Sequence, residues 1–269
     1  MIQKKLWLSK YWWIFKLDWK QSVHYFSDYL LSALFIAIIL FIFTHLWQTI
    51  FAGNRSVEGL TITQLIWYLT LTESIALSIG WRSMFDNVAD DIKSGSIANY
   101  LTKPLSYMGW YFSSNLSKFF NYFATFIVIG GIVTYALVGP LHFSLLNLLP
   151  LVFLLILSFI LSFFVGMAFV SLAFWFEDVT AFYWILQKAL FILGGMLVPI
   201  DVYPEFVQQY LYYLPVSFIT YWPAKYFVTG SADILYTAVL GQVIWGVIFF
   251  GIAVSIYKIG IRKVNIHGG

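Results

Sequence analysis

Cysteine is absent from the sequence, and charged residues are scarce in it. Without cysteine the chain can form no disulfide, no thiolate metal site and no thiol nucleophile. Charged residues make up 10% of the 269 residues, whereas a soluble domain carries about a quarter. Because so few charges cannot cover the surface of a soluble protein of this length, the composition indicates an integral membrane protein.

Motifs for metal binding and catalysis are missing as well. The four histidines are widely scattered and never lie four residues apart, so they have no metal-ligand spacing. The sequence contains no GxxxxGK phosphate loop, no HExxH helix and no GxSxG turn. We therefore predict no catalytic residue, no metal site and no cofactor within this chain.

Long apolar runs are abundant. Hydrophobic residues make up 61% of the chain, and runs of about twenty of them are long enough to cross a bilayer as helices. We predict an all-α integral membrane protein with a single transmembrane domain over residues 1–269 and six transmembrane helices. The predicted spans are residues 29–51, 61–81, 115–137, 145–174, 181–199 and 235–257.

Lysine and arginine predict the orientation of these spans. An even number of spans places both termini on one side of the membrane. Twelve of the fifteen lysines and arginines flank the spans on that side, whereas Arg55 and Lys225 lie on the other and Lys188 lies within a span. Because cytoplasmic flanks are rich in lysine and arginine, we expect both termini and residues 90–106 to be cytoplasmic.

The segment before the first span combines lysines with tryptophans. Trp7, Trp12, Trp13 and Trp19 suit the headgroup level of a bilayer, where lysines meet anionic lipid. We interpret residues 1–28 as an interfacial amphipathic helix along the inner leaflet; an ordinary aromatic flank of the first span is the alternative. No small-residue cleavage site follows the opening lysines, so we expect no removable signal peptide.

A polar, turn-rich stretch interrupts the apolar pattern after the second span. Val88 and Ile92 lie one helical turn apart, as do Ile97 and Leu101. Gly95 lies between the two pairs and suits the end of a helix. We predict two short amphipathic helices joined at Gly95.

Polar residues mark the ends and the outer face of these two helices. Ser96 is placed to cap the second helix, and Pro104 is placed to end it. The connection of residues 82–114 has more than thirty residues, and such long ordered loops are usually functional. A surface loop lying on lipid is the alternative. The expected mixed-charge face consists of Asp90, Asp91, Lys93 and Lys103.

The order of these parts resembles the membrane subunit of type-2 ABC transporters, the ABC-2 permeases, in a bacterial branch of that family. The resemblance covers nearly the whole chain and rests on DIKSGSIANYLTKPLS at 91–106 and GGMLVPIDVYPEFVQQYLYYLP at 194–215. In that family, the polar loop between the second and third spans docks into a groove of a cytoplasmic ATPase. The resemblance therefore implies ATPase coupling by Asp90, Asp91, Ile92, Lys93, Ser94, Gly95, Ser96, Ile97, Leu101, Lys103 and Pro104.

The same resemblance implies the partners and the location. It implies a permease subunit of an ATP-driven exporter in the bacterial plasma (inner) membrane, bound to separate ABC ATPase subunits that hold ATP and magnesium. This chain would then not be an enzyme. Two permease subunits, identical or related, would pass substrate along their interface, and no nucleic acid is involved. Lipid, peptide, drug and glycan exporters share this scaffold, so the substrate stays open.

Residues 199–234 form a second polar region, rich in tyrosine and proline and expected outside the membrane. Pro204 suits the first turn of a helix whose apolar stripe ends at Pro215. An aromatic belt that serves only as an anchor is one interpretation. The resemblance instead implies short re-entrant or external helices that cap the transport path, with the cap residues Pro199, Tyr203, Pro204, Glu205 and Pro215.

Three single charges stand apart from these segments. Asp178 is a natural cap for the fifth span, and a second ATPase contact is the alternative. Glu73 and Lys188 lie at one depth, about 10–12 Å from the inner boundary. Because isolated charges in lipid seek partners, we predict that they pair, within one subunit or across a dimer. The alternative is that Lys188 reaches the cytoplasm while Glu73 is protonated or bonded to Thr70.

Two other functional classes fit the sequence less well. A stand-alone secondary transporter predicts ionisable residues in several spans and an internal repeat, yet only Glu73 and Lys188 lie within spans and no repeat is evident. An intramembrane enzyme needs a nucleophile, a base or metal ligands in converging spans, and the motifs for these are missing. The transporter permease is therefore the preferred hypothesis.

Overall fold

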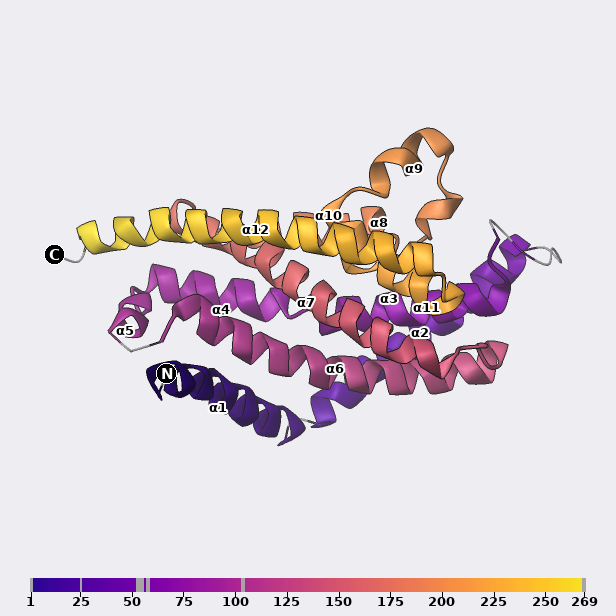
Figure 1. Ribbon diagram of the computed structural model, residues 1–269, viewed down its shortest axis with the longest axis horizontal. Helices are drawn as coiled ribbons and strands as arrows, with labels where there is room; N and C mark the ends of the chain where they lie inside the picture. Colours follow the sequence, from indigo (N-terminus) through magenta and orange to yellow (C-terminus); the bar gives the residue numbers. More distant parts are fainter. Residues whose placement is uncertain (1, 25, 52–55, 57–58, 103–104, 268–269) are drawn as a thin grey trace.

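The computed structural model describes residues 2–24, 26–51, 56, 59–102 and 105–267, with side chains at 9–21, 34–51, 56, 59–100, 102 and 105–262. In this part of the chain, all regular elements are helices (Figure 1). The long helices are α1 (Ile2–His24), α2 (Phe26–Phe51), α3 (Ile62–Ser78), α6 (Tyr107–Val138), α7 (Leu148–Val170) and α12 (Ala232–His267). The shorter ones are α4 (Trp81–Lys93), α5 (Ile97–Leu101), η1 (Leu145–Asn147), η2 (Ser171–Phe174), α8 (Thr180–Leu193), η3 (Ile200–Val202), α9 (Glu205–Leu211), α10 (Pro215–Ile219) and α11 (Tyr221–Thr229).

Five helical segments of the described chain are long and apolar enough to cross a membrane. They are Leu34–Phe51, Ile62–Lys93, Tyr107–Val138, Leu145–Phe174 and Ala232–Arg262. The remaining predicted span, residues 181–199, corresponds to α8, which has 14 residues and ends at Leu193. At 1.5 Å per residue this helix covers about 21 Å, less than the roughly 30 Å of a hydrocarbon core. The expected six full-length spans are thus five, plus one short apolar helix.

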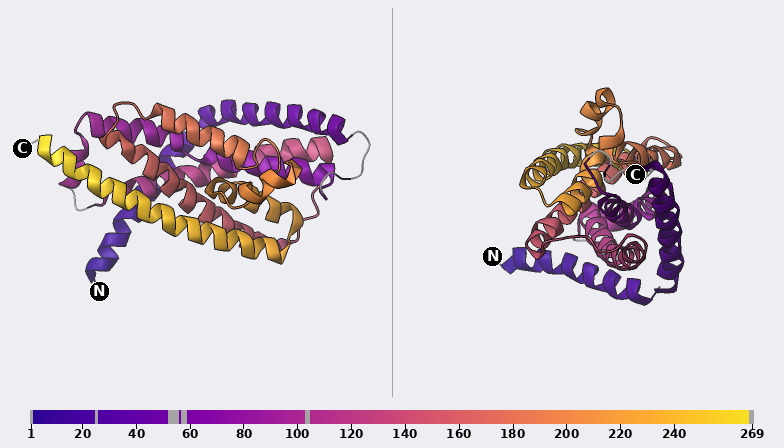
Figure 2. Two further views of the ribbon diagram at one scale, coloured as in Figure 1. Left: turned by 90° about the horizontal axis from the view of Figure 1, so that it is seen from above. Right: turned by 90° about the vertical axis from the view of Figure 1, so that its right-hand side faces the viewer.

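The long helices form one bundle (Figures 1 and 2). α12 packs along α7, and α6 packs against α2 and α3. α1 also packs against α6, and Figure 2 shows it crossing the bundle obliquely. α5, the start of α1 and the end of α12 lie toward one end of the bundle, and α9 lies in the opposite half. We call the end of the bundle at which α5 lies the α5 end.

α3 lies at the centre of the bundle although its segment is the least apolar of the five. An 18-residue stretch of Ile62–Lys93 has a mean hydropathy of 1.2, the lowest of the five, yet 61% of that stretch is buried, against 50% or less for the corresponding stretches of the others. The hydroxyls of Thr70, Ser74 and Ser78 each donate to the backbone carbonyl four residues earlier. These bonds satisfy the buried hydroxyls within the helix, which allows a polar sequence to occupy the core.

A break separates α3 from α4. Ile79 is extended and Gly80 follows it before α4 begins at Trp81. The indole nitrogen of Trp81 donates to the carbonyl of Ser162 in α7 at 2.8 Å. Gly166 makes room for this ring, because a Cβ there would come within 2.6 Å of the indole nitrogen. The break therefore lets the chain change direction at the point where the hydrogen bond of Trp81 attaches it to α7.

Two predicted span boundaries do not coincide with helix ends. The second span was predicted to reach residue 81, but its first helix ends at Ser78 because the break intervenes. The third span was predicted to begin at residue 115, but α6 begins at Tyr107, where the hydroxyl of Ser106 accepts from the N–H of Gly109. The predicted region 82–114 thus contains nearly all of α4, the whole of α5 and the first turns of α6, and residues 94–106 lie between α4 and α6.

The exposed face of α1 combines tryptophan with lysine. Trp12, Trp13 and Leu17 are exposed, and the Lys16 ammonium lies 5.2 Å and 5.0 Å from the centres of the two indole rings. On the opposite face, the hydroxyl of Tyr11 accepts from the backbone N–H of Ser106 at 3.0 Å. α1 is therefore attached to the bundle by one face and presents apolar and cationic groups on the other.

Candidate functional site

α4 separates apolar from charged residues at helical spacing. Its buried residues face α7, α8 and η2 and are Trp81, Met84, Phe85, Val88 and Ala89. Its charged residues, exposed on the other side, are Arg82, Asp86, Asp90 and Lys93. The two sets alternate every three or four residues, which is the pattern of a helix lying on a protein surface. α4 thus fixes a charged face at the α5 end of the bundle.

The chain turns at Gly95, as predicted. Gly95 has a φ of +73°, a left-handed conformation that favours glycine, and its N–H donates to the carbonyl of Ile92 at 3.2 Å. α5 follows, and its first residue, Ile97, is completely buried. We call residues 81–102 the elbow. Ile97 anchors the far side of the elbow while Gly95 stays exposed at its tip.

Asp91 does not belong to the charged face, contrary to the prediction. It is partly buried, and its Oδ2 accepts from the hydroxyls of Tyr107 and Tyr111, both at 2.9 Å. Its Oδ1 accepts from the Ser96 hydroxyl at 2.8 Å. The predicted cap by Ser96 is therefore wrong as well, because its side chain bonds back to Asp91 and makes no capping bond to α5. Asp91 joins α4 to the first turns of α6.

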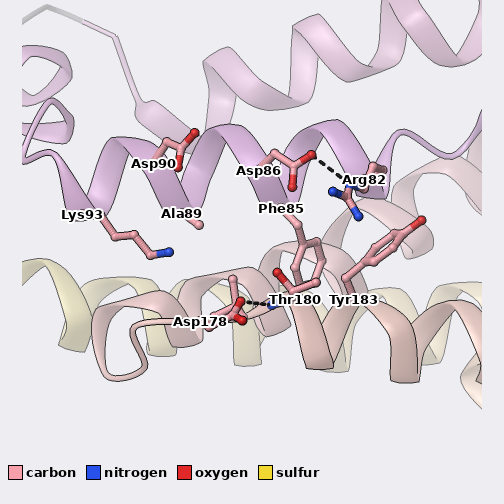
Figure 3. Close-up of a pocket in the computed structure, with 10 residues that line it drawn as sticks. Arg82, Phe85, Asp86, Ala89, Asp90, Lys93, Asp178, Thr180 and Tyr183 are labelled. Carbon is pink, nitrogen blue, oxygen red and sulfur yellow. Dashed lines mark hydrogen bonds and ion pairs between the residues drawn. The ribbon is translucent and has the colours of Figure 1, made fainter.

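A polar cleft lies between α4 and the connection that leads into α8. It has a volume of about 210 Å³ and is lined by Arg82, Asp86, Asp90 and Lys93 from α4 and by Asp178, Thr180 and Tyr183 from the other side (Figure 3). Within it, Arg82 Nε lies 2.9 Å from Asp86 Oδ2. The cleft therefore places α4 next to the connection that leads into α8, at the α5 end of the bundle.

Asp178 occupies the far wall of this cleft. Its carboxylate accepts from the backbone N–H of Thr180, the first residue of α8, at 2.8 Å. Hydrogen bonds from the Thr180 hydroxyl and from this N–H hold the pKa of Asp178 below its ordinary value, and Lys93 across the cleft lowers it further. Asp178 therefore stabilises the start of α8 while its exposed carboxylate faces α4.

The predicted coupling residues thus fall into separate environments. Ile97 is buried, whereas Asp91, Ile92 and Ser96 are partly buried. Lys103 and Pro104 lie outside the described residues, as does the side chain of Leu101, the last residue of α5. The exposed ones, which a partner can touch, are Asp90, Lys93, Ser94 and Gly95.

Glu73 and Lys188 approach one cavity but do not pair within this chain. Among the described residues, neither carboxylate oxygen of Glu73 has a hydrogen-bond partner. Thr70 bonds to Ile66 and Thr134, so the alternative of a Thr70–Glu73 bond is wrong too. Lys188 is exposed, and its ammonium lies over the rings of Trp184 and Phe191. Both residues line the cavity described below without forming an ion pair.

The predicted cap residues lie within residues 199–229, a region of short helices that we call the cap. The Tyr203 hydroxyl donates to the carbonyl of Ile192 at 2.9 Å. Pro204 immediately precedes α9, and Glu205, its first residue, is exposed. Pro199 is buried before η3. Pro215 does not end this helix as predicted, because α9 ends at Leu211 and Pro215 opens α10.

An ion pair that the sequence analysis missed holds the cap together. Lys225 Nζ lies 2.7 Å from Asp201 Oδ2, and both side chains are mostly buried, at 15% and 17% exposed. Asp201 Oδ1 accepts from the hydroxyls of Tyr221, at 2.9 Å, and Tyr212, at 3.2 Å. Burial, and then the nearby carboxylate, raise the pKa of Tyr221, which keeps it a donor. Asp201 and Lys225 lie too far apart in sequence for their spacing to signal this contact.

Comparison with known proteins identifies the relatives of this chain. The model of the ABC-2 family transporter protein matches residues 31–268. This match includes the elbow, the wall of the cleft, Glu73, Lys188 and the cap. No curated protein matches the chain.

Proposed function

Because the chain belongs to the ABC-2 family of transporter membrane proteins, we propose that it is the permease subunit of an ATP-driven exporter. A separate cytoplasmic ABC ATPase binds ATP and magnesium, and this chain converts its motion into substrate translocation. Membership in a transport family and the missing phosphate loop both support a subunit that is not itself catalytic.

The cleft beside α4 is the observation that carries this proposal. It presents exposed charges of both signs, Asp90 and Lys93 on one wall and Asp178 on the other. Exposed charges of both signs suit a polar protein partner, because they give specificity and fast association at little cost in stability. We propose that the ATPase docks over the elbow and contacts the α8 connection as well.

The elbow is attached to other helices at both ends of α4, so it can transmit a movement of the partner to them. Trp81 ties the start of α4 to α7 through Ser162, and Asp91 ties its end to α6 through Tyr107 and Tyr111. A partner that displaces α4 therefore pulls on two membrane-length helices at once. In the proposed mechanism, closure of two ATPase subunits moves the elbows of two permease subunits, identical or related, and opens the path between them.

The membrane arrangement follows from the same proposal. Five long helices span the plasma membrane, and α8 with the chain up to the cap completes a sixth crossing. The α5 end faces the cytoplasm together with both termini, and α1 lies in the inner leaflet with its tryptophans and Lys16 among the headgroups. The cap then faces outward over the path.

Co-purification with a candidate ABC ATPase tests the function. We expect a stoichiometric complex in mild detergent, lost on Asp90→Lys in the elbow. Asp233→Lys, an exposed carboxylate at the start of α12, is the matched control and should keep the complex. A chain that transports substrate with no ATPase bound would instead be a stand-alone secondary transporter, which a buried Glu73 would also suit.

Single-cysteine labelling tests the orientation. Because the sequence contains no cysteine, only the introduced cysteine can react. Asn99 in α5 and Glu205 in α9 are both exposed. In whole cells, Glu205→Cys should react with a membrane-impermeant maleimide, whereas Asn99→Cys should react only after permeabilisation. Labelling of Asn99→Cys from outside would reverse the proposed orientation and exclude docking of a cytoplasmic ATPase there.

A further inference from the structure

A lateral cavity separates α2, α3 and α8 near the middle of the bundle. Its volume is about 410 Å³, within the range of roughly 300–1,000 Å³ typical of small-molecule sites. α2 contributes Phe35 and Ile39, and the break before α4 contributes Ile79 and Trp81. The side chains that give the cavity its chemistry are Glu73, Arg82, Tyr183, Gln187, Lys188 and Phe191.

Two polar groups that line this cavity lack partners. Glu73 is 1% exposed and is the only charged side chain buried in the described part of the chain. Neither of its oxygens, nor Oε1 of Gln187, accepts a hydrogen bond from any described residue. Buried polar atoms are almost always paired, and leaving one unpaired is costly. All three oxygens without a partner are hydrogen-bond acceptors when Glu73 is ionised. A ligand that binds here therefore has to supply hydrogen-bond donors.

The nearby cations do not fill this role. The Arg82 guanidinium is engaged by Asp86 at 2.9 Å, away from Glu73. The Lys188 ammonium is 5.9 Å from the ring centres of both Trp184 and Phe191, at an exposed position. Glu73 therefore has no counter-charge among the described residues although Arg82 and Lys188 line the same cavity, and most of the remaining lining is aromatic or aliphatic.

We propose that this cavity binds the protonated amine of an amphipathic molecule. Glu73 and Gln187 accept hydrogen bonds from the ammonium group, and the apolar part of the molecule lies against Phe35, Trp81 and Phe191. An ammonium supplies both the charge that Glu73 needs and the donors that Gln187 needs, whereas an alcohol or a carboxylate does not. Aromatic walls favour a cation further.

The proposal rests on the proposed function only in naming this amine as the transported substrate. Binding itself requires neither an ATPase nor turnover. The amine has two possible sources, an aminophospholipid of the bilayer or a free lipophilic amine. Both present the same ammonium group to Glu73, so the experiment has to distinguish them.

Photocrosslinking in nanodiscs tests the proposal. The probe is a twelve-carbon amine with a diazirine in its chain, and the nanodiscs contain phosphatidylcholine, which has no N–H donor. We expect crosslinks on peptides of α3 and α8, and competition by dodecylamine but not by dodecanol or dodecanoate. If phosphatidylethanolamine also competes, the source is lipid; if only dodecylamine competes, it is a free amine.

Glu73→Gln separates recognition from folding. The amide keeps the shape of the side chain and removes a buried charge, so the protein should fold at least as well. We expect the amine to bind about tenfold more weakly or worse, since a charge-assisted hydrogen bond is lost. Glu177→Gln changes an exposed carboxylate outside the cavity and should bind as the unaltered protein does.

Three results would overturn the proposal. The first is equal crosslinking by the amine probe and by its alcohol analogue, and the second is crosslinking unchanged by Glu73→Gln. The third is binding that arises only after Lys188→Gln, because the lysine of a second copy would then be the natural occupant. Neither result affects co-purification of the ATPase, so failure of this proposal and failure of the transport function remain distinguishable.

Discussion

The elbow and the cap are each built around one aspartate that accepts two tyrosine hydroxyls. In the elbow, Asp91 accepts from Tyr107 and Tyr111; in the cap, Asp201 accepts from Tyr212 and Tyr221. The difference is the cation. Lys225 completes the site of Asp201 at 2.7 Å, whereas Asp91 has a serine hydroxyl as its third donor.

This difference indicates how each region is used. The cap satisfies its charges internally, so it holds one arrangement without help from another molecule. Of its charged residues, the elbow partly buries only Asp91, pairs Arg82 with Asp86 at an exposed position, and leaves Asp90 and Lys93 exposed beside a cleft whose other wall carries Asp178. A region that keeps its charges exposed is suited to a partner, and a region that buries them is suited to a fixed structure.

The largest effect is expected when the cap loses its aspartate. Asp201→Ala leaves Lys225 mostly buried without a counter-charge and removes the acceptor of two tyrosines. We expect a loss of about 3–5 kcal/mol, measured as a fall in the melting temperature in detergent. Glu177→Ala, an exposed carboxylate, is the control. If the pair carries the effect, adding Lys225→Met to Asp201→Ala should restore much of the stability.

The elbow should respond less strongly to the equivalent change. Asp91→Ala leaves tyrosine hydroxyls unpaired but no buried cation, so we expect a loss of about 1–3 kcal/mol. The neighbouring Asp90 is exposed and provides the control, since Asp90→Ala should change the melting temperature little. Equal losses for the two alanine variants would mean that Asp91 is not the residue that joins α4 to α6.

Much of the helical order was predictable from the sequence, because span length and hydropathy are local properties. The span predicted at residues 145–174 coincides with the segment Leu145–Phe174, which is helical, long and apolar enough to cross a membrane. The turn at Gly95 was predictable because positive φ selects glycine. The tyrosine partners of Asp91 and the aspartate partner of Lys225 lie 16 to 24 residues away in sequence, so no local pattern signals them. For the same reason, the ion pair predicted between Glu73 and Lys188 does not form within this chain, although both residues line one cavity.

A change at the elbow tip should affect coupling more than stability. Gly95→Val places a β-branched residue at a φ of +73°, which costs about 1–2 kcal/mol. Gly59→Val is a matched control, because Gly59 also has a positive φ, +76°, and no atoms near its missing Cβ. Both variants should lose similar stability, but only Gly95→Val should reduce substrate-stimulated ATPase activity of the assembled complex. Full activity in Gly95→Val would exclude the tip as the docking point.

The smallest effect concerns the exposed ion pair between Arg82 and Asp86. Its members are 59% and 51% exposed and lie one turn apart on α4, so water and salt screen their attraction. We expect a coupling energy of about 0.3–0.5 kcal/mol from the double-mutant cycle of Arg82→Ala and Asp86→Ala, decreasing in high salt. The cycle is necessary because Arg82 also lies over the ring of Tyr183 at 5.5 Å, and its removal alone would cost that contact too. A coupling energy as large as that between Asp201 and Lys225 would mean that the elbow, like the cap, is held together by its own charges. Fewer unpaired charges would then be available on its charged face to bind an ATPase.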